Sequence, residues 1–317
     1  MSTAKAFEIS TVGVQTGVSF ENILVATDFS PCSEAALPYA LGLAKRYGSK
    51  VYTAYVMPHQ VFVESAQPDL IQARRTAERK LAEIANMEAI QGIKHGELIR
   101  EGEVPEVIAN LIRQQRIDLL VMGTSGRKGV SKLLLGSVAE AVFRTAECPV
   151  LTIGPRVVRG PKPNGTLSPV FRQILFATDF GPESVDALPF ALSLAEENRA
   201  RLTLLHVSPE PLPVLPEPEP GGMPIVVDTR EVVKSAEGHL RRLIPEGAPV
   251  WHEPTYMVQF GPAAETILKF AEQNVDLIVL GVKRPGALTK HLGAGVAYKV
   301  VSEAPCPVLT VGPRFYK

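Results

Sequence analysis

The amino-acid sequence predicts an α/β protein of two tandem, doubly wound domains, each a five-stranded parallel sheet flanked by helices. The first observation is an internal repeat: Ile23–Phe29 returns as Ile174–Phe180. The run Cys148–Arg156 likewise returns as Cys306–Arg314. A repeat of this kind indicates two copies of one structural unit. The second observation is the length of 317 residues, which fits two domains of about 150 residues. The third is the alternation of short β-branched runs with longer helical stretches, which is typical of parallel sheets.

Each element of the first copy has its own sequence signal. The first helix is expected to begin at Ser30-Pro31, a hydroxyl cap followed by a proline in the first turn. The run Leu119–Met122 is apolar at every position, as are central strands of parallel sheets, and Leu277–Leu280 repeats it. The predicted strands are Ile23–Thr27, Val51–Val56, His95–Arg100, Leu119–Gly123 and Val150–Gly154. The predicted helices are Pro31–Tyr47, Leu70–Ala89, Val104–Gln115 and Ser137–Ala146.

The domain boundaries follow from the ends of the repeat. We expect a first domain over residues 1–156, a linker over 157–170 that is rich in glycine and proline, and a second domain over 171–317. The proline-rich segment Pro209–Pro224 has no counterpart in the first copy and is predicted to be an extended surface loop.

The charge balance, the lack of long apolar runs and the small number of cysteines exclude several classes of protein. Thirty-three Lys and Arg balance 33 Asp and Glu, so no overall field favours nucleic acid or an anionic membrane as a partner. No apolar run has the roughly 18–20 residues that span a bilayer, and no secretory signal is expected. Three cysteines are too few for a disulfide framework, so Cys148 and Cys306 are predicted to be small buried residues, with a redox pair as the alternative. A cytoplasmic location is expected.

A glycine loop in the first copy is chemically suited to a polyphosphate. Gly123 and Gly126 follow the apolar strand, and Gly136-Ser137 opens the next helix. Such a segment is expected at the carboxyl ends of the strands, where open α/β sheets bind ligands. Glycines allow close approach to backbone N–H groups, and a helix N-terminus adds unpaired donors. Ser137 could cap that helix or donate to a phosphate, and Arg127 lies nearby in the sequence. An ordinary capped loop is the alternative.

These motifs resemble the universal stress protein family, whose nucleotide-binding members carry G-2x-G-9x-G-[ST] after the fourth strand. Gly123, Gly126, Gly136 and Ser137 match that spacing without a gap, and the resemblance covers nearly all of both copies. It implies an adenine-nucleotide α-hydrolase-like fold that binds ATP, with AMP or ADP and an accompanying Mg²⁺ left open. Asp28 and Val56 would hold the adenosine end. The ribose and phosphates would be lined by Met122, Gly123, Gly126, Gly136, Ser137 and Val138, and Arg127 would add a cation close by. Asp28 has a structural alternative, because it could cap the helix at Pro31.

The second copy departs from the motif. Aligned on Gly123 and Gly281, it has Arg284 in place of Gly126 and Ala294 and Gly295 in place of Gly136 and Ser137. We therefore expect nucleotide in the first domain alone, although a remodelled second site is conceivable. The two domains are expected to pair with each other through Pro149–Gly154 and Pro307–Gly312, since exposed edge strands invite pairing. A homodimer of two chains is a further expectation.

The leading functional hypothesis is a nucleotide-binding regulatory or stress-response protein, with at most slow ATP hydrolysis. No catalytic residues and no metal ligands are predicted, because the six histidines show no paired spacing. His206 is predicted to be a packed strand residue. The alternatives are an ATP-hydrolysing or ATP-activating enzyme of the same superfamily and a nucleotide-free structural dimer.

Overall fold

The computed structural model describes residues 17–57, 67–124, 135–159, 171–210, 229–248, 250–283 and 295–312. Within them the chain forms one ten-stranded sheet in the order β3-β2-β1-β4-β5-β10-β9-β6-β7-β8. The two predicted five-stranded sheets are therefore halves of one continuous sheet. Most of the proline-rich segment and most of the predicted linker lie outside the described residues.

The first half alternates strands and helices as the sequence predicts. Its strands are β1 (Asn22–Ala26), β2 (Lys50–Met57), β3 (Lys94–Glu101), β4 (Leu119–Gly123) and β5 (Val150–Ile153). Its helices are α1 (Pro31–Tyr47), α2 (Gln67–Ala85), the 3₁₀ turn η2 (Glu88–Ile90), α3 (Val104–Gln114), α4 (Ser137–Thr145) and α5 (Pro155–Arg159). The short helix α5 occupies the start of the segment predicted to be a linker.

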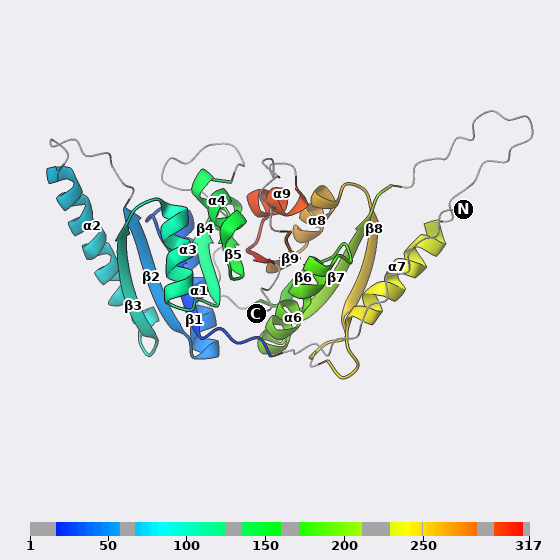
Figure 1. The fold of residues 1–317 in the computed structure, drawn as a ribbon. Coiled ribbons are helices and arrows are strands. Elements are labelled where there is room, and N and C mark those ends of the chain that lie inside the picture. Colours follow the sequence, from blue (N-terminus) through cyan, green and yellow to red (C-terminus); the bar gives the residue numbers. More distant parts are fainter. Residues whose placement is uncertain are drawn as a thin grey trace, which may run out of the picture.

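The second half repeats this order. Its strands are β6 (Gln173–Ala177), β7 (Arg201–Ser208), β8 (Thr255–Phe260), β9 (Leu277–Gly281) and β10 (Val308–Val311). Its helices are α6 (Pro182–Asn198), α7 (Thr229–Leu243), α8 (Ala263–Ala271) and α9 (Val296–Glu303). Figure 1 shows α2 and α7 at the two outer ends of the molecule.

The prediction for the second helix was wrong at both ends. The helix was expected over Leu70–Ala89, but α2 runs from Gln67 to Ala85. Pro68 is compatible with an earlier start, because a proline in the first turn of a helix removes no intrahelical hydrogen bond. At the other end Met87 N donates to Ile84 O at 3.1 Å, three residues back, so the chain tightens into the 3₁₀ turn before Ala89.

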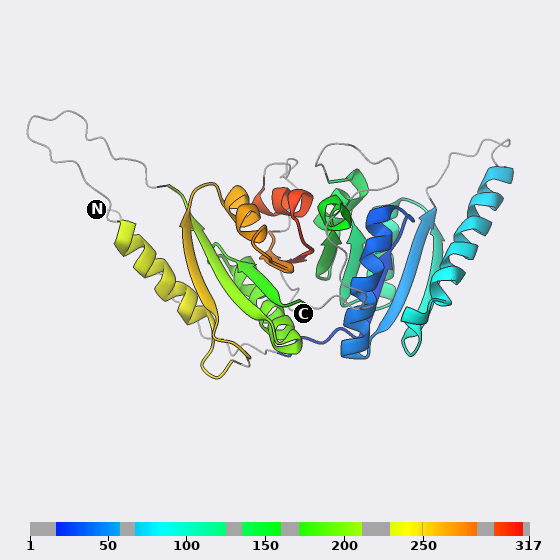
Figure 2. The ribbon, with the colours of Figure 1, turned by 180° about the vertical axis from the view of Figure 1, so that it is seen from behind.

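Helices cover both faces of the sheet. On one face α1 and α6 pack with Leu240 of α7, and on the other α3, α4, α8 and α9 pack over Leu24 and Leu175. Accordingly α3 lies in front of the sheet in Figure 1, and α1 lies in front of it in Figure 2, which is seen from behind.

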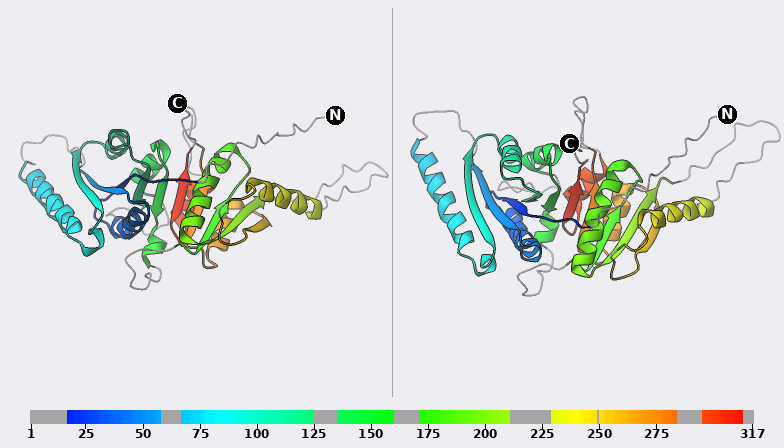
Figure 3. Two further views of the ribbon diagram at one scale, coloured as in Figure 1. Left: turned by 90° about the horizontal axis from the view of Figure 1, so that it is seen from below. Right: turned by 60° about the horizontal axis from the view of Figure 1, so that its bottom comes forward.

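The two halves join through their last strands. Strand β10 pairs with β5 in antiparallel register, Leu309 opposite Leu151, whereas all other neighbouring strands are parallel. Figure 3 shows β5 and β10 side by side at the centre of the molecule. We call this pairing the seam. It confirms the predicted pairing of Pro149–Gly154 with Pro307–Gly312 and removes an open sheet edge from each half.

An arginine after β5 also spans the seam. Arg156 Nη1 donates to the Glu303 carbonyl at 3.0 Å, and Arg156 Nη2 lies 2.8 Å from Glu272 Oε1. Since Glu272 and Glu303 belong to the second half, this side chain ties α5 to the ends of α8 and α9.

Candidate functional site

The candidate site lies where the strand order reverses in the first half. Strand β1 has β2 on one side and β4 on the other, with Ala26 in register with Met122. In open α/β sheets this switch point, at the carboxyl ends of the strands, is where ligands bind. The residues that follow the paired positions, Asp28 and Gly123, therefore lie at adjoining strand ends. The topology thus brings two predicted site residues to one place.

Asp28 shapes the turn between β1 and α1. Its Oδ1 accepts the Ser30 N–H at 3.0 Å, whereas Ser30 itself is the N-cap of α1, with its hydroxyl accepting from Ser33 N. Asp28 is half-buried. The cap predicted at Ser30 is confirmed, so Asp28 is not the cap of this helix.

A hydroxyl pair that sequence reasoning missed supports this turn. Thr27 Oγ1 accepts the Phe29 N–H at 3.0 Å and lies 3.2 Å from Ser33 Oγ. The turn needs this support because Phe29 adopts φ 60°, a left-handed conformation that is uncommon outside glycine. The repeated Thr-Asp-Phe sequence was the available signal, since Phe180 has φ 62° in the second half.

Val56 and Met122 are buried residues at the ends of β2 and β4. They are 8% and 5% exposed and pack in the apolar cluster beneath α3 and α4. The two side chains therefore form an apolar surface at the switch point, on the face of the sheet that α4 covers.

The sequence predicts that Gly123 is a glycine so that a phosphate can approach the backbone. The structure gives a different reason for a glycine here, which is the close packing of helix α1. A Cβ at Gly123 would lie 2.7 Å from Ser33 N and 2.8 Å from Cys32 Cβ. The glycine therefore allows α1 to begin against the end of β4. Gly281 does the same in the second half, where a Cβ would lie 2.1 Å from the Glu183 carbonyl oxygen.

Helix α4 begins at Ser137, as predicted, and the structure decides which residue caps it. Gly136 is the N-cap, so Ser137 is the first helical residue and does not cap the helix. Gly136 N donates to Thr124 O at 2.9 Å, and no side chain among the described residues caps α4. Val138 is 41% exposed in the first turn. An uncapped first turn presents N–H donors to an anion.

Gly126 and Arg127 lie outside the described residues, as does the middle of the predicted loop. Thr124, at the start of that loop, is 1% exposed, and its Oγ1 has no hydrogen-bond partner among the described residues. The aligned residue of the second half is Val282, which has a methyl group in place of the hydroxyl.

The equivalent place in the second half is built differently. Helix α9 begins at Val296, after the N-cap Gly295. Gly295 aligns with Ser137, the first residue of α4, so α9 begins one residue later in the repeat than α4 does. Burial raises the pKa of Asp179, but hydrogen bonds from Gly181 N and Ser184, with attraction to Lys283, outweigh it and hold that pKa below its usual value. The carboxylate of Asp179 is thus occupied by neighbours of its own half.

Other predicted features can be placed as well. Cys32, Cys148 and Cys306 are buried thiols that form no disulfide, and their burial confirms the prediction of small packed residues for Cys148 and Cys306. Burial raises the pKa of the Cys306 thiol to about 12, which opposes thiolate formation. No group of three His, Cys, Asp or Glu side chains in the described part of the chain is arranged to bind a metal ion. None of the described helices has the length and apolar character to cross a membrane.

The fold and the switch-point site define a tandem pair of doubly wound α/β domains of the adenine-nucleotide α-hydrolase-like kind. The model of the Universal stress protein family matches residues 19–154 and, a second time, residues 171–312. The chain therefore belongs to the universal stress protein family, as a tandem two-domain member.

Individual relatives agree with this assignment. A universal stress protein of Methanocaldococcus jannaschii is 34% identical over 149 residues, covering 45% of this chain and 84% of that protein. The crystal structure of a universal stress protein from Archaeoglobus fulgidus superposes with a TM-score of 0.68 at 21% identity, covering 93% of this chain and 97% of that one. A functionally unknown protein from Pseudomonas aeruginosa gives a TM-score of 0.60 at 17% identity, with 93% of each chain covered. The two structures support the fold alone.

Proposed function

We propose that this protein is an adenine-nucleotide-binding regulatory protein of the stress response, and that ATP binds in its first half. The observation that carries the proposal is the juxtaposition of Asp28 with the uncapped start of α4 at the switch point between β1 and β4. A carboxylate can accept hydrogen bonds from a ribose, and helix N–H donors suit phosphate oxygens. Val56 and Met122 supply the apolar base of the same place.

In this proposal each side of the switch point binds one end of the nucleotide. Asp28 and the end of β2 near Val56 hold the adenosine. The first turn of α4, with Gly136, Ser137 and Val138, holds the phosphates together with Gly126 and Arg127. Helix N-termini stabilise anions through their unpaired N–H groups and their partial positive charge. The bound nucleotide in this proposal is ATP, with Mg²⁺ on its phosphates. The protein is proposed to act in the cytoplasm.

The second half serves as a packing partner and not as a second nucleotide site. Two observations support this asymmetry: the later start of α9 and the absence of a hydroxyl at Gly295. The seam then makes the second half a covalent dimerisation partner at high effective concentration.

The proposal is tested by counting nucleotides. Full-length protein is equilibrated with ATP, ADP or AMP, separated from free ligand, and denatured for mass spectrometry. One adenine nucleotide per chain is expected. Two per chain would contradict the asymmetry, and none would favour the nucleotide-free structural pair. Steady turnover at about 1–100 per second, the range of dedicated phosphotransferases, would instead support an enzyme.

A further inference from the structure

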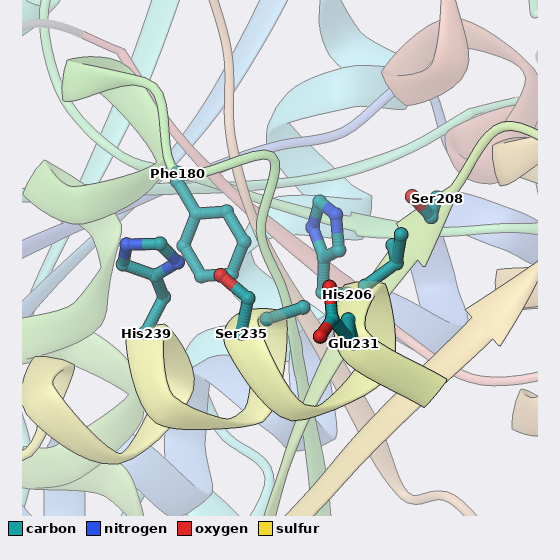
Figure 4. A pocket seen from close by; sticks show the side chains of 8 residues that line it. Phe180, His206, Ser208, Glu231, Ser235 and His239 are labelled. Carbon is teal, nitrogen blue, oxygen red and sulfur yellow. The ribbon is translucent and has the colours of Figure 1, made fainter. Parts of the chain in front are cut away.

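A hollow that is open to the surface lies in the second half between helix α7 and the end of β7 (Figure 4). Its volume is about 460 Å³, within the range of small-molecule sites. The lining residues are Phe180, His206, Ser208, Glu231, Val232, Ser235, Ala236 and His239. We call it the α7 cavity.

The first half fills the corresponding space with large side chains. There Tyr55 and Met57, 8% and 4% exposed, pack against Ala77 and Leu81 of α2. At the repeat-related positions β7 carries His206 and Ser208, so two of the filling side chains are replaced by smaller ones. A polar cavity in one copy, at a place the other copy fills, indicates a use specific to the second half.

A third replacement lies on the covering helix. Lys80 Nζ of α2 lies 4.8 Å from the ring centre of Phe29. His239 of α7 occupies the matching place, with its ring centre 5.5 Å from that of Phe180. Where the first half has a permanent cation beside its aromatic ring, the second half therefore has an imidazole.

The α7 cavity is separate from the proposed nucleotide position. Val56 packs in the apolar cluster on the α3 and α4 face, and Val207 packs in the matching part of that cluster under α8 and α9. Successive strand residues point to opposite faces. His206 and Ser208, on either side of Val207, therefore face α7. The cavity lies on the opposite side of the sheet from the nucleotide position.

The polar groups around the α7 cavity favour a hydrogen-bond donor. His206 Nδ1 lies 2.9 Å from the Thr178 carbonyl, which can only accept, so Nδ1 donates. Nε2 of the neutral imidazole is then an acceptor. Glu231 adds a carboxylate, and it stands in line with Ser235 and His239 at four-residue spacing along one face of α7.

The wall of the α7 cavity beside His206 is aromatic. The Phe180 ring stacks on His206 with centres 4.4 Å apart, and Figure 4 shows Phe180 between His206 and His239. The cavity therefore combines an apolar surface with a negatively charged, acceptor-rich rim.

We propose that the α7 cavity binds a small organic ammonium compound with a short aromatic or apolar body. The ammonium group would lie toward Glu231 and the body against Phe180. An anion would meet the Glu231 carboxylate, and a metal ion would find no group of three suitable ligands among the described residues.

The test compares two probes of the same shape on the full chain. Phenethylamine carries the ring and the ammonium, and 2-phenylethanol keeps the ring without the charge. Calorimetric titration is expected to show saturable 1:1 binding of phenethylamine. The alcohol should bind about fivefold more weakly, because about fivefold in affinity is the most that an exposed ion pair usually contributes. Equal affinities, or no binding of phenethylamine, would overturn the proposal.

Three variants locate the binding. Glu231→Gln should weaken phenethylamine about fivefold, whereas Glu237→Gln, which makes the same change on α7 outside the lining, should leave it unaltered. The double variant H206Y/S208M restores the side chains of the first half and should abolish binding, with melting recorded to verify folding. Unchanged affinity in Glu231→Gln, or in a folded double variant, would refute the assignment.

Discussion

The hydroxyl of Thr152 in the first half donates to the Val308 carbonyl of the second half at 3.1 Å. The relationship is reciprocal, because Thr310 Oγ1 donates to the Val150 carbonyl at 3.2 Å. Both threonines are 2% exposed. The seam is therefore held by side-chain hydrogen bonds as well as by the backbone ladder, and it makes the two halves one unit.

Replacing either seam threonine with valine should destabilise the protein. Thr152→Val and Thr310→Val keep the shape and remove one buried donor each. We expect a loss of about 1 kcal/mol in the free energy of unfolding for each change, because a buried hydrogen bond contributes about that much. Urea denaturation measures the loss, and unchanged midpoints in both variants would show that the seam does not depend on these hydroxyls.

The same substitution at Thr124 should have the opposite effect. Thr124 Oγ1 is buried without a hydrogen-bond partner among the described residues, and the second half has Val282 there. Thr124→Val removes an unsatisfied polar group, so we expect the nucleotide-free protein to gain about 1 kcal/mol. The two seam variants are the matched controls in the same denaturation experiment. A loss at Thr124 equal to theirs would mean that this hydroxyl is satisfied in solution.

Gly123 should tolerate no side chain. A Cβ there would lie 2.7 Å from Ser33 N, so Gly123→Ala must displace the start of α1. We expect a cost of about 1–3 kcal/mol, the usual cost of overpacking. Gly17→Ala is the control, because a Cβ at Gly17 meets nothing within 4 Å. Equal melting temperatures for the two variants would contradict the packing role of Gly123.

The Asp179 carboxylate should stabilise the second half at neutral pH and cease to do so in acid. Its pKa is lowered in the folded state, so its contribution is fully present above the unfolded value near 3.8 and is lost as the pH falls through the lower folded value. Asp179→Asn should therefore reduce stability at pH 7, and the gap to the wild type should narrow below about pH 4. Chemical denaturation at several pH values measures this gap. A gap independent of pH would exclude the ionised carboxylate as its source.

The fold could be predicted largely from the sequence because its signals are local and repeated. Ser30-Pro31 marks the start of α1, and the apolar run Leu119–Met122 marks a central strand. The ends of α2 were wrong because they depend on how the chain turns at Pro68 and Met87, which side-chain periodicity does not encode.

The candidate site could be predicted only in part. The motif locates the start of α4, but the role of Gly123 depends on the position of Cys32 and Ser33 over β4, a tertiary contact. The prediction of His206 as a packed strand residue is confirmed by its ring contact with Phe180 and its hydrogen bond to Thr178. The α7 cavity could not be predicted from the sequence, because its lining combines His239 of α7 with residues of β7. Which residues of α7 face β7 depends on how the helix packs on the strand.

The central claim, that the first half alone binds nucleotide, is tested most directly by a matched pair of helix-cap variants. Gly136→Val puts a branched side chain at the N-cap of α4, where even a Cβ would lie 3.2 Å from Thr124 O, and Gly295→Val does so at the N-cap of α9. ATP affinity is measured calorimetrically on both folded variants. We predict that Gly136→Val abolishes ATP binding and that Gly295→Val retains the wild-type affinity. Loss of binding in Gly295→Val, with binding kept in Gly136→Val, would contradict the account.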